Sequence, residues 1–336
     1  MSIEVRRVKC SRCGMVRQEK LPWLSAHSGY TQRYAWFVGR QCQKSTVKDV
    51  ARELHLHWET VKELEKEYMR AKLDRAPEPM PAVIGIDEIS VGKGHVYRII
   101  VSDLIEKRAI WFGGNDRSEK SMDQFYRWLG PDKCKMIRLA VMDMWKAFET
   151  SARNHVNPVA ILYDKFHVIS HLNKALDKVR KQEYARLAGK NRTFIKGQKY
   201  TLLSRHKNLT TKGKNSLKLL LNANKRLNIA YMLKESFGQL WDYESVTWAR
   251  KFFDQWKASL KWQRLKPYDD FARLIEAHWD GIAAHCKPEN KISLDYVEGL
   301  NNKIRVFQRR AYGLKDQEYF KLKVLTCTLP EIYEND

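Results

Sequence analysis

Hydrophobic side chains near the start of the chain recur every three or four positions, the spacing of helices. We expect helices over residues 30–41 and 46–54, a short break at residues 55–57, and a third helix over residues 58–70. Two short helices, a tight break and a third helix with a polar face are typical of a helix-turn-helix region that binds DNA. A small three-helix bundle without DNA contacts is the alternative.

The pattern changes after residues 75–81, a proline-rich connector. Short runs rich in β-branched residues follow, and they predict three consecutive strands over residues 82–91, 95–104 and 108–114. Helices and strands then alternate, in the order 118–129, 136–143, 145–155 and 160–164. A meander of three strands followed by helix, strand, helix and strand predicts an α/β layer with a mixed sheet.

Only helical patterns occur between residues 165 and 290, with a polar stretch at 192–214 that we interpret as a loop. Two more helices are expected near the end of the chain, over residues 293–310 and 319–325. We therefore expect an N-terminal helix-turn-helix region, a mixed-sheet domain formed by two chain segments, and a helical insertion between those segments. Their boundaries are expected at 1–75, at 76–165 with 291–336, and at 166–290.

Charge adds a function to this outline. Lysine and arginine number 62 against 39 acids, and the net charge of +23 favours nucleic acid as a partner over a merely soluble basic protein. The imbalance is greatest over residues 174–226, which contain 16 basic residues and only two acids, Asp177 and Glu183. We expect four basic side chains of this stretch to contact DNA phosphates: Lys178, Arg180, Lys181 and Arg186. On the third helix, Lys62 and Lys66 are expected to face outward and to contact DNA in the major groove.

Composition excludes several other classes of protein. Hydrophobic residues make up 43% of the chain, which is enough for packed cores and excludes global disorder. No apolar run approaches the roughly 18 residues of a membrane span. The N-terminus has no apolar signal segment, and six scattered cysteines fit a reducing cytoplasm better than a disulfide framework.

Three acidic residues stand at informative places. Asp87 lies inside an apolar strand, where a bound cation explains a carboxylate best. Asp143 ends another strand, although an Asp there is also a common helix cap. Adjacent strands would bring the two carboxylates close enough to share a hard divalent metal. Glu298, on a helix with Arg305, Arg309 and Arg310, is the candidate third ligand, with the arginines holding phosphate; a solvated ion-pair network is the alternative.

These motifs together resemble a known family. Asp87 in IGIDEIS, Asp143 in VMDMWKAF, His167 in DKFH, and Glu298 in VEGLNNKIR followed by RRAYG resemble the ISL3 family of insertion-sequence transposases, relatives of the Mutator-like and hAT-like transposases. The resemblance implies a helix-turn-helix region, an RNase H-like domain with a DDE triad formed by Asp87, Asp143 and Glu298, and a helical insertion before the glutamate. It also implies two Mg²⁺ ions, cleavage of transposon ends, and joining of a 3′-hydroxyl to target DNA.

The same resemblance implies double-stranded DNA as the partner, at least a homodimer on DNA, and a bacterial, nucleoid-associated location in the cytoplasm. His167 would support the active site near the scissile phosphate, or else be a helix-start histidine bonded to Asp164. The family's zinc region is only partly present, because Cys10 and Cys13 lack the upstream pair that four-ligand zinc needs, so zinc there is not favoured. The alternatives are an RNase H-like nuclease without strand transfer and a transposase-derived DNA-binding regulator.

Overall fold

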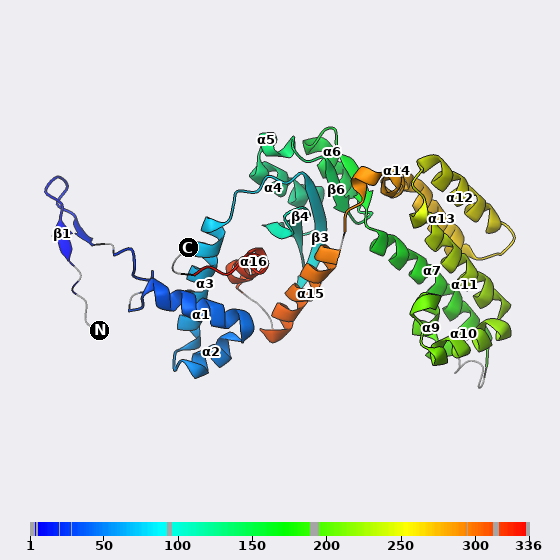
Figure 1. Cartoon of the computed structure of the whole chain (residues 1–336), viewed down its shortest axis with the longest axis horizontal. Coiled ribbons are helices and arrows are strands. Elements are labelled where there is room, and N and C mark those ends of the chain that lie inside the picture. Colours follow the sequence, from blue (N-terminus) through cyan, green and yellow to red (C-terminus); the bar gives the residue numbers. More distant parts are fainter. Residues whose placement is uncertain are drawn as a thin grey trace. The chain divides into compact units, whose positions relative to one another are not determined.

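The computed structural model describes residues 4, 6–19, 21–27, 29–92, 96–188, 195–293, 295–311 and 316–333 (Figure 1). The chain forms two compact units. Unit 1 comprises Met1–Pro79, Arg108–Phe112 and Gly299–Asp336, and unit 2 comprises Met80–Lys107 and Gly113–Glu298. Each unit is described by itself below.

Unit 1 contains the expected three helices, α1 (Gln32–Lys44), α2 (Val47–Glu53) and α3 (Trp58–Arg75), together with the C-terminal helix α16 (Gln317–Thr326). Threonine side chains cap α1 and α2 by accepting backbone N–H groups of their first turns. Gly39 lies where α1 crosses α3, and a Cβ there would lie 2.4 Å from the Tyr68 ring. Only glycine permits this close approach of the two helices.

One part of unit 1 was expected to be helical but forms strands. Strands β1 (Arg7–Lys9) and β2 (Val16–Gln18) form an antiparallel hairpin before α1. All three residues of β1 are exposed, so the hairpin has no buried face to leave a hydrophobic pattern in the sequence. The third helix also runs beyond residue 70, to Arg75.

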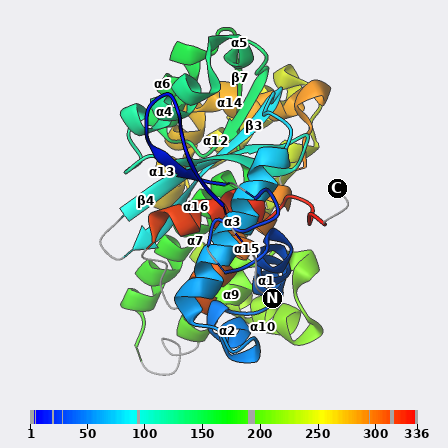
Figure 2. The ribbon, with the colours of Figure 1, turned by 90° about the vertical axis from the view of Figure 1, so that its left-hand side faces the viewer.

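A five-stranded mixed sheet confirms the predicted α/β layer. Its strands are β3 (Val83–Gly92), β4 (Val96–Asp103), β5 (Arg108–Gly113), β6 (Leu139–Met142) and β7 (Ala160–Tyr163), in the spatial order β5-β4-β3-β6-β7. Strand β3 pairs antiparallel with β4, beside it in Figures 1 and 2, whereas β3, β6 and β7 are parallel. Parallel strands need helical crossovers, which are α4 (Glu119–Leu129), α5 (Pro131–Cys134) and α6 (Lys146–His155).

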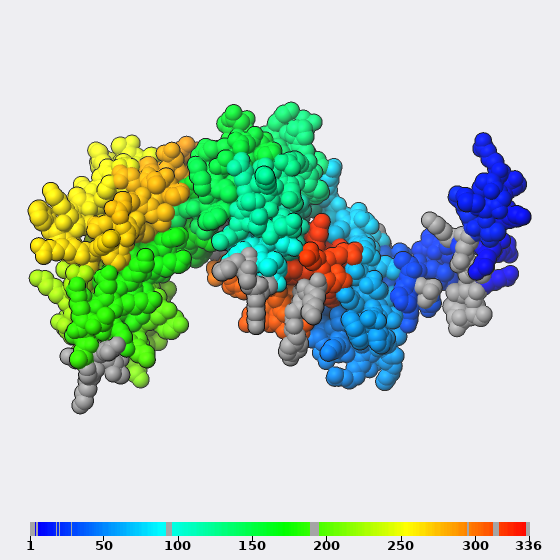
Figure 3. Space-filling model, turned by 180° about the vertical axis from the view of Figure 1, so that it is seen from behind, coloured from blue at the N-terminus to red at the C-terminus, as the bar shows by residue number. Residues whose placement is uncertain are grey.

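The rest of unit 2 is the expected large helical region. Its helices are α7 (Lys165–Arg186), α9 (Lys199–Leu203), α10 (Thr211–Ala223), α11 (Lys225–Phe237), α12 (Val246–Ser259), α13 (Lys266–Ala277) and α14 (Trp279–Ala283). Short 3₁₀ turns lie between or after the described helices, at His206–Asn208, Gly238–Asp242, Ala284–Cys286 and Pro288–Asn290. Helix α15 (Asp295–Arg310) follows, and from Gly299 onward it belongs to unit 1. Figure 3 shows the surface of these helices, coloured green to orange.

Aromatic rings fill the core of this helical region. The Trp256 ring packs edge to face against Phe237 and Phe271, and its indole N–H donates to the Leu233 carbonyl at 3.0 Å. Two tryptophans of this region are exposed, Trp248 by 60% and Trp262 by 81%. The prediction of a loop over residues 192–214 was wrong in part, because α9 and the start of α10 lie within that range.

Candidate active site and nucleic-acid interface

The register of the parallel strands brings three acidic residues level with one another. Gly85 pairs with Val141 across β3 and β6, and Met142 pairs with Tyr163 across β6 and β7. Extending the register by one or two residues sets Asp87 beside Asp143, and Asp143 beside Asp164. Neighbouring strands lie about 4.8 Å apart, so the three carboxyl groups gather at one edge of the sheet.

The local electrostatics agree with this register. Burial raises the pKa of Asp164, and the negative charges of Asp87 and Asp143 raise it further. Each carboxylate also accepts a nearby backbone N–H group, from Glu88 to Asp87 at 2.7 Å and from Met144 to Asp143 at 2.6 Å. Backbone donors of this kind hold the two carboxylates in fixed positions.

Helix α7 begins at this edge and brings a histidine to it. Asp164 caps α7 by accepting the Phe166 N–H at 2.8 Å. One turn later, Nδ1 of His167 lies 3.0 Å from Oδ2 of Asp143, and its Nε2 lies 3.9 Å from Asp164. The bond to Asp143 raises the pKa of His167 to about 9, although burial opposes that rise. The imidazole is therefore protonated at neutral pH. Burial acts to raise the pKa of Asp143, but His167 holds it below its ordinary value.

Sequence reasoning did not identify Arg117, which lies next to this cluster. Its guanidinium pairs with Glu88 at 2.7 Å and lies 4.4 Å from the Tyr97 ring centre and 4.8 Å from that of Trp145. The Trp145 indole N–H also donates to the Arg117 carbonyl at 2.7 Å. A lone arginine in a polar loop gives no pattern in sequence, so only the folded chain shows that it is fixed beside the carboxylates.

The predicted metal triad is brought together only in part. Asp87 and Asp143 are level on adjacent strands and offer the carboxylate oxygens that Mg²⁺ prefers. Glu298 is exposed on α15. Among the described residues, no three His, Cys, Asp or Glu side chains are placed to hold one metal ion. Asp87 and Asp143 therefore come level through the strand register, whereas Glu298 lies on a helix outside that register.

The cysteines considered for zinc lie in the β1–β2 hairpin. Cys10 and Cys13 are free thiols, and Cys13 is exposed. Hydrogen bonds from the Cys13 and Arg12 backbone lower the pKa of Cys10.

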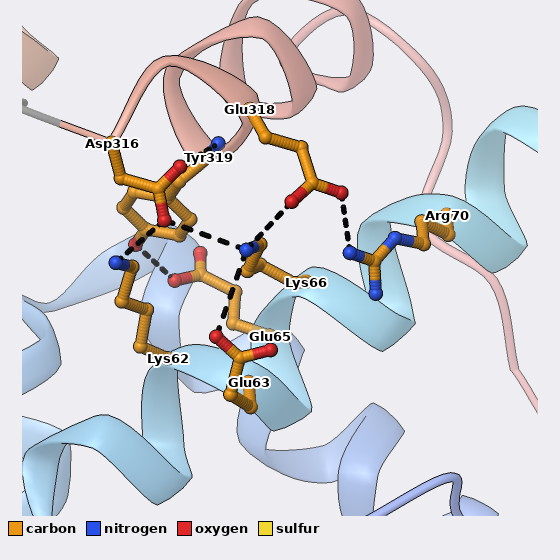
Figure 4. Close-up of polar contacts among 8 residues, drawn as sticks. All are labelled: Lys62, Glu63, Glu65, Lys66, Arg70, Asp316, Glu318 and Tyr319. Carbon is orange, nitrogen blue, oxygen red and sulfur yellow. Dashed lines mark hydrogen bonds and ion pairs between the residues drawn. The ribbon is translucent and has the colours of Figure 1, made fainter.

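The lysines expected to contact DNA from α3 are held by acids of unit 1 itself (Figure 4). Nζ of Lys62 lies 2.7 Å from Asp316, and Nζ of Lys66 lies 2.8 Å from Glu318 and 3.4 Å from Asp316. The Lys66 side chain is only 8% exposed. Its predicted outward position was wrong, because α16 covers this face of α3 and supplies the opposite charges. The bond to Glu318 raises the pKa of Lys66, which keeps the ammonium charged despite its burial.

The basic side chains of α7 are of two kinds. Arg180 is buried, with its Nε 2.7 Å from Asp177, so its expected place on a DNA-facing surface was wrong. Lys181 and Arg186 are exposed but also pair with acids of the same helix, Asp177 at 3.2 Å and Glu183 at 2.9 Å. Lys178 is exposed. On α15, the three arginines of the predicted phosphate site are exposed: Arg305, Arg309 and Arg310.

A helix-turn-helix region combined with a mixed sheet that gathers carboxylates at its strand ends is typical of one class of protein, the DNA-processing enzymes. Comparison with known families narrows the class. Residues 19–69 match the helix-turn-helix domain of transposase family ISL3, and residues 84–324 match the transposase model of the same family. The chain belongs to the ISL3 family of transposases, as the sequence motifs predicted.

Two relatives illustrate the match. The chain is 33% identical over 322 residues to the transposase for insertion sequence element IS1001 of Bordetella parapertussis, covering 95% of this chain and 79% of that protein. It is 26% identical over 361 residues to the transposase for insertion sequence element IS1557 of Mycobacterium tuberculosis, covering 97% of this chain and 78% of that one. Among the residues that the structure describes, no helix is long and apolar enough to cross a membrane.

Proposed function

We propose that this transposase cleaves the ends of its element and joins the 3′-hydroxyls to target DNA by Mg²⁺-dependent phosphoryl transfer. The single observation that supports the proposal is the register of β3 and β6, which brings Asp87 on β3 level with Asp143 directly after β6. These two carboxylates would hold Mg²⁺, with Glu298 as a third ligand. Two bound ions would stabilise the attacking and leaving oxygens.

The remaining steps belong to the chain's own residues. His167, with its Nδ1 3.0 Å from Asp143, would hold that carboxylate in position. Arg305, Arg309 and Arg310, further along α15, are exposed and would bind DNA phosphates.

DNA recognition is assigned to the exposed end of the helix-turn-helix. The first residues of a recognition helix read bases, and the helix before it crosses the backbone. Trp58 and Glu59 at the start of α3 are exposed, as are Lys48 and Arg52 on α2 and His55 in the turn. We therefore prefer this end over Lys62 and Lys66, which α16 neutralises.

We propose the following roles for the segments of the chain. Residues 1–75 bind the transposon ends, residues 76–165 and 291–336 form the catalytic domain, and residues 166–290 form the insertion. Two ends must be processed together, so the active form is at least a dimer on DNA. Its place is the cytoplasm, on the nucleoid.

The test is incubation with labelled transposon ends and Mg²⁺, reading nicked and joined products together. Asp87→Asn and Asp143→Asn should each lower cleavage at least about a thousandfold, while end binding stays near normal because phosphate neutralisation is the work of basic residues. Asp132→Asn is the matched control, because that carboxylate is 91% exposed on α5. Glu298→Gln should also abolish cleavage.

Each alternative function has its own outcome in this assay. Nicks without joined products would favour a nuclease, and end binding without nicks in the wild type would favour a regulator. Substantial cleavage by Asp143→Asn would remove that residue from the active site.

A further inference from the structure

One face of α7 leads away from the acidic cluster as a basic stripe. Its members recur at alternating intervals of four and three residues, which places them on one side of a helix. They are His167, His171, Lys174, Lys178 and Lys181. At 1.5 Å per residue, the stripe extends about 21 Å from the histidine bonded to Asp143.

The stripe forms one wall of a cavity inside unit 2. The cavity has a volume of about 570 Å³ and lies between α7, α9 and α13. From α7 it is lined by His171 and all three lysines of the stripe, from α9 by Lys199, and from α13 by Asp270 among others. Basic side chains from two helices therefore converge on one space.

The acids of this cavity are already neutralised by other residues. Asp177 pairs with Arg180 at 2.7 Å and with Lys181 at 3.2 Å, and Asp270 pairs with Arg273. Within the described parts of the chain, Lys174, Lys178 and Lys199 have no carboxylate within ion-pair distance. Three unpaired ammonium groups on one cavity attract an anion of matching spacing, as a nucleic-acid backbone has.

We propose that this cavity binds a single DNA strand next to the reacting phosphate. The cavity has a volume of only about 570 Å³. It cannot enclose a duplex, because a duplex is wider than its own major groove, which is about 12 Å across. Tyr200, directly after Lys199 but outside the cavity lining, is 77% exposed, and its ring centre lies 5.5 Å from Nζ of Lys199, so its outer face is open to a stacked base. A basic groove combined with an exposed aromatic ring is the usual means of holding a single strand without reading its sequence.

The inference rests on the proposed function only for the statement that the strand continues to the reacting phosphate. Binding can be tested without cleavage. The probes are a fluorescent single strand of twelve thymidines and a blunt duplex of about thirty base pairs, each titrated with the full chain over a range of salt. The variant is Lys174→Gln/Lys178→Gln/Lys199→Gln. Its matched control is Lys212→Gln/Lys214→Gln/Lys218→Gln, three exposed lysines of α10 outside the cavity lining.

The cavity variant should lose affinity for the single strand, and the salt slope of log affinity should fall by about 2, at about 0.7 per lost contact. The control variant should keep both the slope and the affinity. Tyr200→Ala should weaken single-strand binding at least about fivefold with no change in the salt slope, because it removes stacking but no charge.

Equal losses in the cavity and control variants would overturn the inference, as would a cavity variant that loses duplex binding but keeps the single strand. A wild type that fails to cut its ends would count against the proposed function and leave this binding result standing. Circular dichroism of each variant shows that it is folded, which the exposure of Lys174 and Lys178 leads us to expect.

Discussion

Helices α3 and α7 carry similar lysine patterns in the sequence but differ in what surrounds them. On α3, Asp316 and Glu318 of the distant helix α16 pair with Lys62 and Lys66. On α7, acids of the same helix pair mainly with Arg180, Lys181 and Arg186, so that Lys174 and Lys178 remain unpaired among the described residues. The same residue type therefore stabilises an interface in one helix and is available to an anionic ligand in the other.

This difference shows what decides the role of a basic side chain. The sequence of a segment shows how many basic side chains it has. Whether each of them can bind DNA depends on the acidic side chains that other helices place beside it. For Lys66, the nearest such acid lies 252 positions further along the chain, at Glu318. The predictions below separate the structural charges of α3 from the functional charges of α7.

The largest effect is expected at the centre of the α3–α16 interface. Glu65 is 1% exposed and pairs there with Lys323, while the Tyr319 hydroxyl donates to it. Lys323→Met would leave the Glu65 carboxylate buried without its partner, so the free energy of unfolding should fall by about 3–5 kcal/mol. Urea denaturation measures this. Lys321→Met, at an exposed position of the same helix, should change stability by less than about 0.5 kcal/mol. Similar small effects of both variants would show that the charges of this interface are not structural.

The first residue of the α7 stripe should be the most sensitive one for activity. His167→Ala removes the partner of Asp143 and should slow cleavage about 10- to 100-fold, the usual effect of losing a group that orients a metal ligand. His167→Asn keeps a donor near the Nδ1 position and should recover part of the rate. The Mg²⁺ concentration for half-maximal cleavage should rise in the alanine variant. An unchanged Mg²⁺ dependence would limit His167 to a structural role beside Asp164 at the start of α7.

Two neighbouring positions of α7 should respond in opposite ways. Arg180→Gln leaves the Asp177 carboxylate with a weaker partner in a buried place, so unfolding should become easier by about 1–3 kcal/mol. Lys178→Gln should leave stability within about 0.5 kcal/mol but lower the salt slope of single-strand binding by about 0.7. Denaturation and binding titrations on both variants give the comparison. Equal salt slopes for the two variants would contradict the distinction drawn between them.

The smallest effect concerns pH and the α3 interface. Burial acts to raise the pKa of Asp316, but its bond to Lys62 and the charges of Lys62 and Lys66 lower it to about 2. A folded-state pKa below the unfolded value means that ionised Asp316 stabilises the fold above about pH 4, and that this contribution disappears between about pH 4 and 2. Wild type should therefore exceed Asp316→Asn by about 1–2 kcal/mol at pH 5–7, and the difference should shrink as pH falls to 3. A difference independent of pH would exclude this ion pair as its source.

Most of the fold was predictable because it depends on buried, periodic side chains. The runs around Ile84, Ile100 and Leu162 mark strands of the sheet, and Val61 and Leu64 mark the inner face of α3. The β1–β2 hairpin and α9 were missed because they bury few side chains and leave little hydrophobic pattern.

The site was predictable only as far as single residues reveal their chemistry. Asp87 and Asp143 stood out because a carboxylate in or at the end of an apolar strand is costly to bury. The burial of Lys66 and the fixed position of Arg117 depend on partners that only folding brings together. The position of Asp164 beside Asp143 also depends on folding, because it follows from the register of β6 and β7.

The most direct test of the contrast between the two helices is a matched pair of neutralisations. Lys62→Gln/Lys66→Gln and Lys174→Gln/Lys178→Gln each remove two lysines, and binding is measured over a range of salt to a duplex that ends in a single-stranded thymidine tail. We expect the α7 pair to lower the salt slope by about 1.4, and the folded α3 pair to leave it unchanged while lowering stability. A loss of slope from the α3 pair with none from the α7 pair would contradict the assignment of structural charges to α3 and DNA-binding charges to α7.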